Sequence, residues 1–150
     1  MNATMKWLNE MNFETDNRGI KTQMDGTLDH GGKDLAPTPK ELVMNAMMGC
    51  TAMDVVSTLQ KMRQTVESYR MSIEVEKNTD YPVYFKKANL IFNLHGPIEV
   101  EKLTKAVDAS LTKYCGVNYM ISKVCEITYD LYLNGEKIKS GKTDFIDPIK

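Results

Sequence analysis

The sequence has little of what marks an exported protein, a nucleic-acid-binding protein or a membrane protein. It has three cysteines in 150 residues, an odd number and too few for the disulfide framework of a small secreted domain. Lys and Arg total 19 against 20 Asp and Glu, so the net charge of −1 indicates no basic surface. No stretch approaches the roughly 20 apolar residues of a membrane span, and no basic and apolar leader opens the chain.

These scarcities favour a cytoplasmic protein, whose thiols start out reduced. Metal ligands are scarce too, because the chain has only His30 and His95 and no CxxC spacing. We therefore predict no metal site and no organic cofactor, and no nucleic acid or membrane as a partner. The length favours a single domain over residues 1–150, large enough to bury a core of its own.

The first third of the chain predicts a small sheet followed by a helix. Short alternating segments at residues 5–8, 12–14 and 19–24 indicate an antiparallel meander, and a loop rich in Asp, Gly and Pro follows. Thr38, Pro39 and Glu41 then combine an N-cap, a first-turn proline and a capping-box acid. The helix that begins there is apolar around most of its circumference as far as Met62, which predicts a central, buried helix.

The rest of the chain predicts a hairpin, a second helix and a final pair of strands. Alternation at residues 69–75 and 83–94 indicates the hairpin, and helical spacing from Val100 to Cys115 indicates the helix, with Gly116 as its C-terminal cap. A strand at residues 124–133 and an Asn-Gly turn lead into a short last strand. The predicted fold class is α+β.

Two of the three cysteines lie in or at the end of segments with helical periodicity. Cys50 lies in the middle of the first predicted helix, and Cys115 lies at the end of the second. A thiol-redox pair is therefore the first hypothesis, against the alternative that each cysteine is a small apolar residue of the core. In a predicted strand, Cys125 lies on the same face as the apolar residues Ile127 and Tyr129, so we expect it to be packed in the core.

Three short motifs resemble one known family. They are Pro-Thr-Pro at residues 37–39, Cys-Thr-Ala-Met-Asp-Val-Val at residues 50–56 and Lys-Tyr-Cys at residues 113–115. With the order of the elements, they are similar to the OsmC/Ohr family, named for osmotically inducible protein C and organic hydroperoxide resistance protein, and most of all to its YhfA-like branch. The resemblance covers nearly the whole chain.

The resemblance implies both a fold and an activity. The implied fold is an intertwined homodimer, in which antiparallel β-sheets wrap around the buried central helix. The implied activity is reduction of organic hydroperoxides in oxidative-stress defence, where Cys50 attacks the peroxide, Cys115 resolves the product as a disulfide, and a dithiol reduces that disulfide. Neither a metal nor an organic cofactor takes part.

A peroxidatic Cys50 must be a thiolate near neutral pH, and the residues around it depart from the family pattern. In the reductases an arginine of the N-terminal strands, held by a glutamate at the start of the helix, assists the thiol. Here Lys40 stands where that glutamate is expected, Glu41 follows it, and Arg18 is the only arginine of the N-terminal segments. Asp54, four residues after Cys50 on the same helical face, opposes ionisation of the thiol.

Two functions therefore remain open. The first is a two-cysteine peroxidase acting on organic hydroperoxides. The second is a dimeric protein of the same fold without peroxidase activity, which binds an apolar small molecule or senses redox state. The pKa of Cys50 separates them, because only the peroxidase needs that pKa to be depressed.

Overall fold

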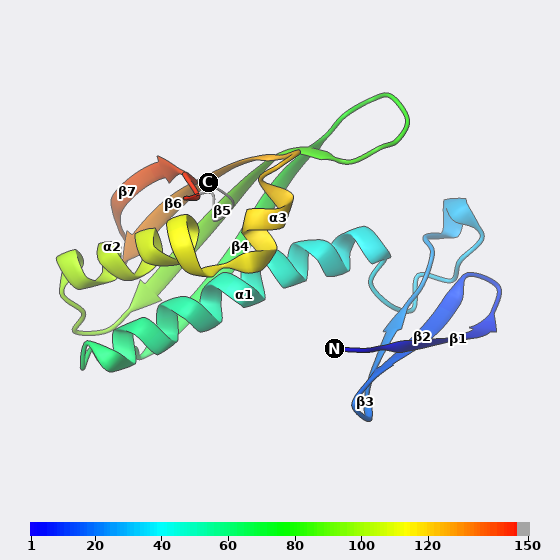
Figure 1. The fold of residues 1–150 in the computed structure, drawn as a ribbon, viewed down its shortest axis with the longest axis horizontal. Coiled ribbons are helices and arrows are strands. Elements are labelled where there is room, and N and C mark those ends of the chain that lie inside the picture. The colour runs from blue at the N-terminus through cyan, green and yellow to red at the C-terminus, as the bar shows by residue number, and fades with distance from the viewer. Residues whose placement is uncertain (147–150) are drawn as a thin grey trace. The chain divides into compact units, whose positions relative to one another are not determined.

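A computed structural model describes residues 1–146, which fall in two compact units that divide between Asn45 and Ala46. Residues 147–150, at the end of the predicted single domain, lie outside the described residues. The structure is a mixed α and β fold with one sheet in each unit (Figure 1). The predicted α+β class is confirmed.

The first unit is built on the predicted meander. Its strands are β1 (Thr4–Asn9), β2 (Asn12–Asn17) and β3 (Ile20–Met24), all antiparallel and in the order β1-β2-β3. The β2–β3 turn is held by Asp16, whose Oδ1 accepts the Gly19 backbone N–H at 2.7 Å. The loop after β3 contains a short 3-10 helix, η1 (Leu28–His30). It surrounds the side chain of Asp25, which is buried. That carboxylate accepts the backbone N–H groups of Gly26, Lys33 and Leu35.

The long helix α1 (Pro39–Lys61) begins where the capping signal predicts. Glu41 Oε2 accepts hydrogen bonds from the Thr38 backbone N–H at 2.7 Å and from the Thr38 hydroxyl at 2.8 Å. The Glu41 backbone N–H in turn donates to Thr38 Oγ1 at 3.4 Å. Because these bonds satisfy donors that a helix end otherwise leaves unpaired, they fix the start of the helix.

In the single chain, α1 is buried along one side, although its sequence is apolar around most of its circumference. Its buried residues form one stripe at four-residue spacing, Met47, Thr51, Val55 and Leu59, whereas Met53 on another face is 75% exposed. By length and composition alone the helix could also cross a membrane, against the prediction that no stretch is apolar enough for a span. The same test is passed by core helices of soluble proteins, so it is weak evidence for a span.

The second unit holds a four-stranded sheet in the order β4-β5-β6-β7 (Figure 1). Its strands are β4 (Ser68–Lys77), β5 (Phe85–His95), β6 (Glu126–Leu133) and β7 (Glu136–Lys142). β4 and β5 form the predicted hairpin, and β6 pairs antiparallel with β7. β5 and β6 are parallel, so the expectation of antiparallel sheets throughout is wrong here. Parallel neighbours need a long crossover, which the helices between them provide.

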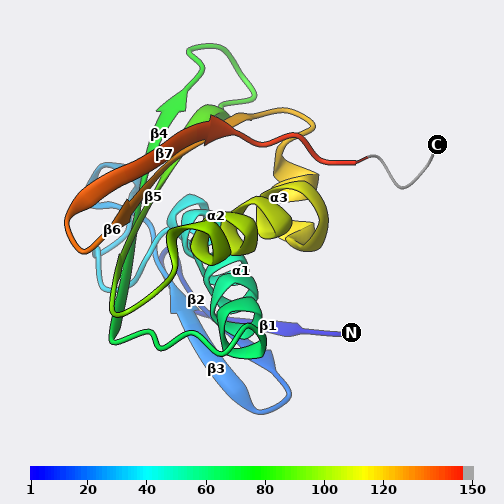
Figure 2. The ribbon, with the colours of Figure 1, turned by 90° about the vertical axis from the view of Figure 1, so that its left-hand side faces the viewer.

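The helices of this unit cover one face of the sheet, as Figure 2 shows for α2 (Val100–Ala109), α3 (Gly116–Ile121) and the second-unit part of α1. The sheet face that meets them is apolar and buried, with Leu90 and Phe92 from β5 and Ile127 and Leu131 from β6. At roughly 25 cal/mol for each Å² of apolar surface removed from water, this layer is the main source of stability of the unit.

The second predicted helix is interrupted before Cys115. α2 ends at Ala109, and a turn of π-helix, η2 (Ser110–Tyr114), follows, in which the Cys115 backbone N–H donates to the Ser110 carbonyl at 3.0 Å. Cys115 leaves the helical conformation with ψ near 95°, and α3 begins at Gly116. The prediction that Gly116 caps the helix is therefore wrong: Cys115 itself stands between two helices.

Candidate functional site

The structure brings Cys50, Cys115 and Asp54 together in the second unit. Their two sulfur atoms and a carboxylate oxygen all lie within 4.8 Å of one another. Cys50 and Asp54 are partly exposed on α1, one helical turn apart, and Cys115 is buried at 1% exposure. Both thiols are free. An S–S bond needs about 2.05 Å, so a small movement of either side chain is required to join them.

The position of Cys115 is set by the start of α3. Its extended backbone makes it the N-cap residue, and its sulfur accepts the Asn118 backbone N–H at 3.4 Å. The preceding π-helical turn inserts one extra residue, which rotates Cys115 and α3 relative to α2. Turns of this kind occur frequently at functional sites.

Thr51 and Asn118 surround the Cys115 sulfur with polar groups in an otherwise apolar core. The Thr51 hydroxyl lies 3.5 Å from Cys115 Sγ as a donor and also reaches the Met47 carbonyl at 3.1 Å. Asn118 Nδ2 donates to Thr51 Oγ1 at 2.6 Å and to the Met47 carbonyl at 3.2 Å. Both side chains are fully buried, and Asn118 Oδ1 has no partner within residues 1–146.

Sequence reasoning missed both residues. Thr51 stands within the matched motif and Asn118 three positions after Cys115, where an asparagine inside a helical apolar pattern is the only available signal. Neither position shows its role until the fold places them beside one sulfur atom.

The surroundings of Cys115 favour its protonated form. Burial raises the pKa of the Cys115 thiol, hydrogen bonds from Thr51 and Asn118 lower it, and the neighbouring Cys50 raises it again through a hydrogen bond and its negative charge. Burial and the Cys50 charge outweigh the two donors, and the pKa of Cys115 rises to about 11. Cys115 is therefore a thiol at neutral pH.

Asp54 is held by the π-helical turn. Its Oδ2 accepts the Ser110 hydroxyl at 2.9 Å, which ties α1 to the start of η2. A carboxylate oxygen of Asp54 lies within 4.8 Å of both sulfur atoms. Asp54 also lines an open cleft of about 620 Å³ in the second unit, whose walls carry both cations and apolar groups. The other lining residues are Ser57, Thr58, Lys61, Met62, Lys105, Ala109 and Tyr114.

The remaining predicted tuning residues lie in the first unit. Arg18 occupies the β2–β3 turn with φ near +63°, Lys40 is exposed in the first turn of α1, and Glu41 caps that helix. Their expected influence on Cys50 stays a prediction.

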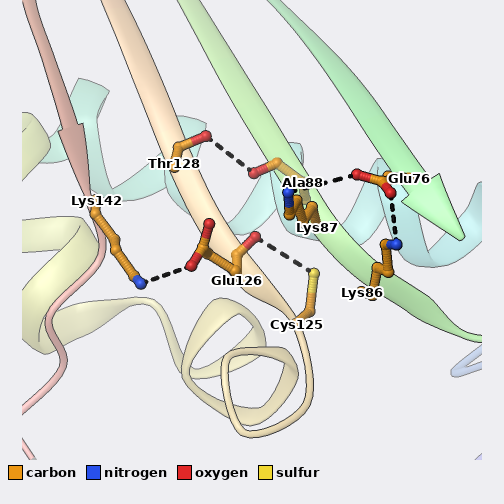
Figure 3. Close-up of polar contacts among 8 residues, drawn as sticks. All are labelled: Glu76, Lys86, Lys87, Ala88, Cys125, Glu126, Thr128 and Lys142. Atoms are coloured by element: carbon orange, nitrogen blue, oxygen red, sulfur yellow. Dashed lines mark hydrogen bonds and ion pairs between the residues drawn. The ribbon is translucent and has the colours of Figure 1, made fainter. Parts of the chain in front are cut away.

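Cys125 lies outside this cluster. It comes directly before β6, is 3% exposed, and its thiol lies 3.7 Å from the Glu126 carbonyl as a donor (Figure 3). Burial, and secondarily the Glu126 charge, raises the pKa of the Cys125 thiol. Two ion pairs lie on the neighbouring strands, Lys142 with Glu126 at 2.8 Å and Lys86 with Glu76 at 2.6 Å (Figure 3). The expectation of a packed cysteine is confirmed.

Comparison of the sequence with known proteins shows which family the chain belongs to. Residues 30–130 match the family described as OsmC-like protein. The chain belongs to the OsmC-like family. A curated relative, protein YhfA of Escherichia coli K12, is 37% identical to it over 131 residues, which cover 86% of this chain and 95% of the relative. The predicted OsmC/Ohr resemblance is thereby confirmed.

Solved structures share the OsmC-like fold. A hypothetical protein from Aquifex aeolicus superposes with a TM-score of 0.80 at 20% identity, covering 90% of this chain and 96% of the other. An organic hydroperoxide resistance protein OsmC from Legionella pneumophila superposes with a TM-score of 0.61 at 16% identity, covering 89% and 95%. At these identities the likeness shows the fold.

Proposed function

We propose that this OsmC-like protein reduces organic hydroperoxides with two cysteines, Cys50 as the attacking thiol and Cys115 as the resolving thiol. The observation that carries the proposal is the approach of their sulfur atoms to within 4.8 Å, from segments 65 residues apart in the sequence. Family membership, and the hydroperoxide resistance named for the Legionella pneumophila neighbour, agree with a redox or hydroperoxide-related function.

The unequal burial of the two thiols suits these two roles. Cys50 is partly exposed, so its thiolate can attack the terminal oxygen of a hydroperoxide; the O–O bond breaks, an alcohol leaves with a proton, and Cys50 becomes a sulfenic acid. Cys115 is buried beside it and attacks the Cys50 sulfur, which releases water and forms the disulfide. A dithiol reductant then restores both thiols.

One of the smaller causes that raise the pKa of Cys115 depends on the state of Cys50, whereas the largest cause, burial, does not. A negative Cys50 is one of the causes that raise the pKa of Cys115. A sulfenic acid is neutral, so this cause disappears on oxidation while the donors Thr51 and Asn118 remain. The pKa of Cys115 should therefore fall once Cys50 has reacted, when Cys115 must become a nucleophile.

The proposal extends to the setting of the reaction. The cleft that Asp54 lines carries the apolar groups of Met62 and Tyr114 beside two lysines, and we propose that the organic part of a hydroperoxide binds there. We place the reaction in a cytoplasmic homodimer engaged in oxidative-stress defence.

One observation favours a second candidate, a dimeric protein without peroxidase activity that binds an apolar small molecule or senses redox state. The Asp54 carboxylate lies beside both sulfurs and opposes the thiolate that a fast peroxidase needs. In that case Cys50 reacts no faster than an ordinary thiol.

The deciding experiment is stopped-flow consumption of cumene hydroperoxide and of hydrogen peroxide by the reduced protein, with mass spectrometry of the product. Peroxidase function predicts fast consumption that prefers the organic peroxide, is lost in Cys50→Ser, and leaves a Cys50–Cys115 disulfide. Cys125→Ser is the matched control and should keep full activity. Slow consumption equal to that of free thiol, with both cysteines still reduced, would reject the peroxidase and leave the second candidate.

A further inference from the structure

The cluster of Cys50, Asp54 and Cys115 has a second chemical capacity that the sequence did not indicate. Two thiols and a carboxylate, within 4.8 Å of one another, are a set of ligand atoms that a divalent ion can share. The three ligands cannot be recognised from their spacing in the sequence. Cys50 and Asp54 are neighbours on α1, but Cys115 comes from the junction of η2 and α3. The expectation of no metal site came from the absence of CxxC and of histidine pairs.

We propose that Cys50, Asp54 and Cys115 together bind one Zn²⁺ ion. On binding, two thiols lose their protons to solvent and two Zn–S bonds and one Zn–O bond form, with no change of oxidation state. Three protein ligands leave a fourth tetrahedral position for water or a small ligand. The proposal does not depend on peroxidase activity.

The distances suit a zinc ion. Zn–S bonds are about 2.3 Å, so two sulfurs on one tetrahedral zinc lie roughly 3.8 Å apart. The two sulfur atoms, at most 4.8 Å apart here, need to move by no more than about 1 Å to reach that geometry. Thiolate sulfur together with carboxylate oxygen favours zinc over the hard ions Mg²⁺ and Ca²⁺, which prefer oxygen ligands alone.

Hydrogen-bond donors around the three ligands resemble those that orient the ligands of metal sites in proteins. Ser110 donates to Asp54 Oδ2 at 2.9 Å, which orients the carboxylate. Cys115 Sγ accepts from Thr51 at 3.5 Å and from the Asn118 backbone N–H at 3.4 Å. Donors of this kind stabilise a metal-bound thiolate and fix its direction.

Charge and access are also favourable. Two thiolates and a carboxylate exceed the charge of the ion by one, and the cleft that Asp54 lines also carries two cations, Lys61 and Lys105. Because Cys50 and Asp54 are partly exposed, an ion can reach the cluster from that side. A bound ion uses the sulfur lone pairs that disulfide formation needs, so zinc binding and oxidation of the pair exclude each other.

Titration of the reduced protein with Co²⁺ in the absence of oxygen tests the proposal. Co²⁺ takes tetrahedral thiolate sites of zinc proteins and reports them by a thiolate-to-cobalt charge-transfer band. We expect one Co²⁺ per chain, displacement by one equivalent of Zn²⁺, and loss of the band in Cys50→Ser and in Cys115→Ser. Asp54→Asn, which can still accept from Ser110, should weaken binding by at least about tenfold.

Cys125→Ser is the matched control, because it removes a buried thiol outside the cluster and should leave the titration unchanged. If Cys115→Ser does not fold, the partly exposed Cys50→Ser carries the test. A second readout is alkylation of Cys50 by N-ethylmaleimide, which Zn²⁺ should block and a chelator should restore. Absence of the charge-transfer band, a band that survives Cys50→Ser, or unchanged affinity in Asp54→Asn would overturn the proposal.

Discussion

Cys115 is the residue on which most of the candidate chemistry depends. Its sulfur is buried, accepts two hydrogen bonds and lies beside a second thiol and a carboxylate. Burial raises its pKa first of all, and Cys50 adds to the rise. Burial of the thiol raises its pKa, and the same packing holds the sulfur in place. Cys115 therefore affects both the stability of the fold and the reactivity of the site.

This raised pKa predicts a pH dependence of stability. The folded state keeps the Cys115 proton up to about pH 11, whereas the unfolded chain loses it near 9.0. The free energy of unfolding should therefore contain a contribution that is fully present below pH 9.0 and is lost as the pH rises through 11. Urea unfolding of the reduced protein across this range, compared with Cys115→Ser, measures it. A difference between the two proteins that is constant with pH would contradict this assignment.

At the scale of elements, the polar bonds between α1 and α3 hold the site together. Asn118 of α3 reaches both the Met47 carbonyl and Thr51 Oγ1 on α1, and Thr51 completes the connection to Cys115. The short helix α3 has six residues and is too short to be stable alone. Its position therefore depends on these bonds as well as on packing.

We predict that Thr51→Val destabilises the protein by about 1–3 kcal/mol. Valine has nearly the shape of threonine, so the cost comes from the lost hydroxyl: Asn118 keeps only its bond to Met47, and Cys115 loses a donor. Thr58→Val, on the same helix, is the control, because the Thr58 side chain has no hydrogen bond within residues 1–146. Urea unfolding followed by circular dichroism compares the two. Equal stabilities would show that the buried network contributes nothing.

Local signals predicted most elements of the fold and its antiparallel hairpins, but not the parallel pairing of two distant strands. The capping box at Thr38 and the alternation in β4 and β5 act within a few residues, so the sequence shows them directly. The parallel pairing of β5 with β6 and the π-helical turn before Cys115 depend on contacts between distant segments. In the candidate site, the two thiols were predicted from the sequence and their separate roles from the family resemblance, whereas Thr51 and Asn118 required the three-dimensional structure.

At the scale of the whole molecule, the part of α1 that belongs to the second unit is buried along one side by the described residues of that unit and exposed at Met53. Met53 is 75% exposed, and with Ala52 and Val56 it lines a largely apolar hollow on the helix surface. A contiguous apolar surface on a helix rich in methionine is typical of a protein interface, since water contact there is costly. The homodimer expected from the family would cover this surface with the same helix of a second chain.

Met53→Glu tests that expectation. A glutamate at the centre of a self-complementary contact places two like charges against each other and should dissociate the dimer, whereas on a free surface it is harmless. Sedimentation should therefore give twice the 17.0 kDa chain mass for the unaltered protein and a single chain mass for Met53→Glu. Thr79→Glu adds the same charge at an exposed position between β4 and β5 and should stay dimeric. A single chain mass for the unaltered protein, or a Met53→Glu variant that remains dimeric, would show that α1 is not the contact between chains.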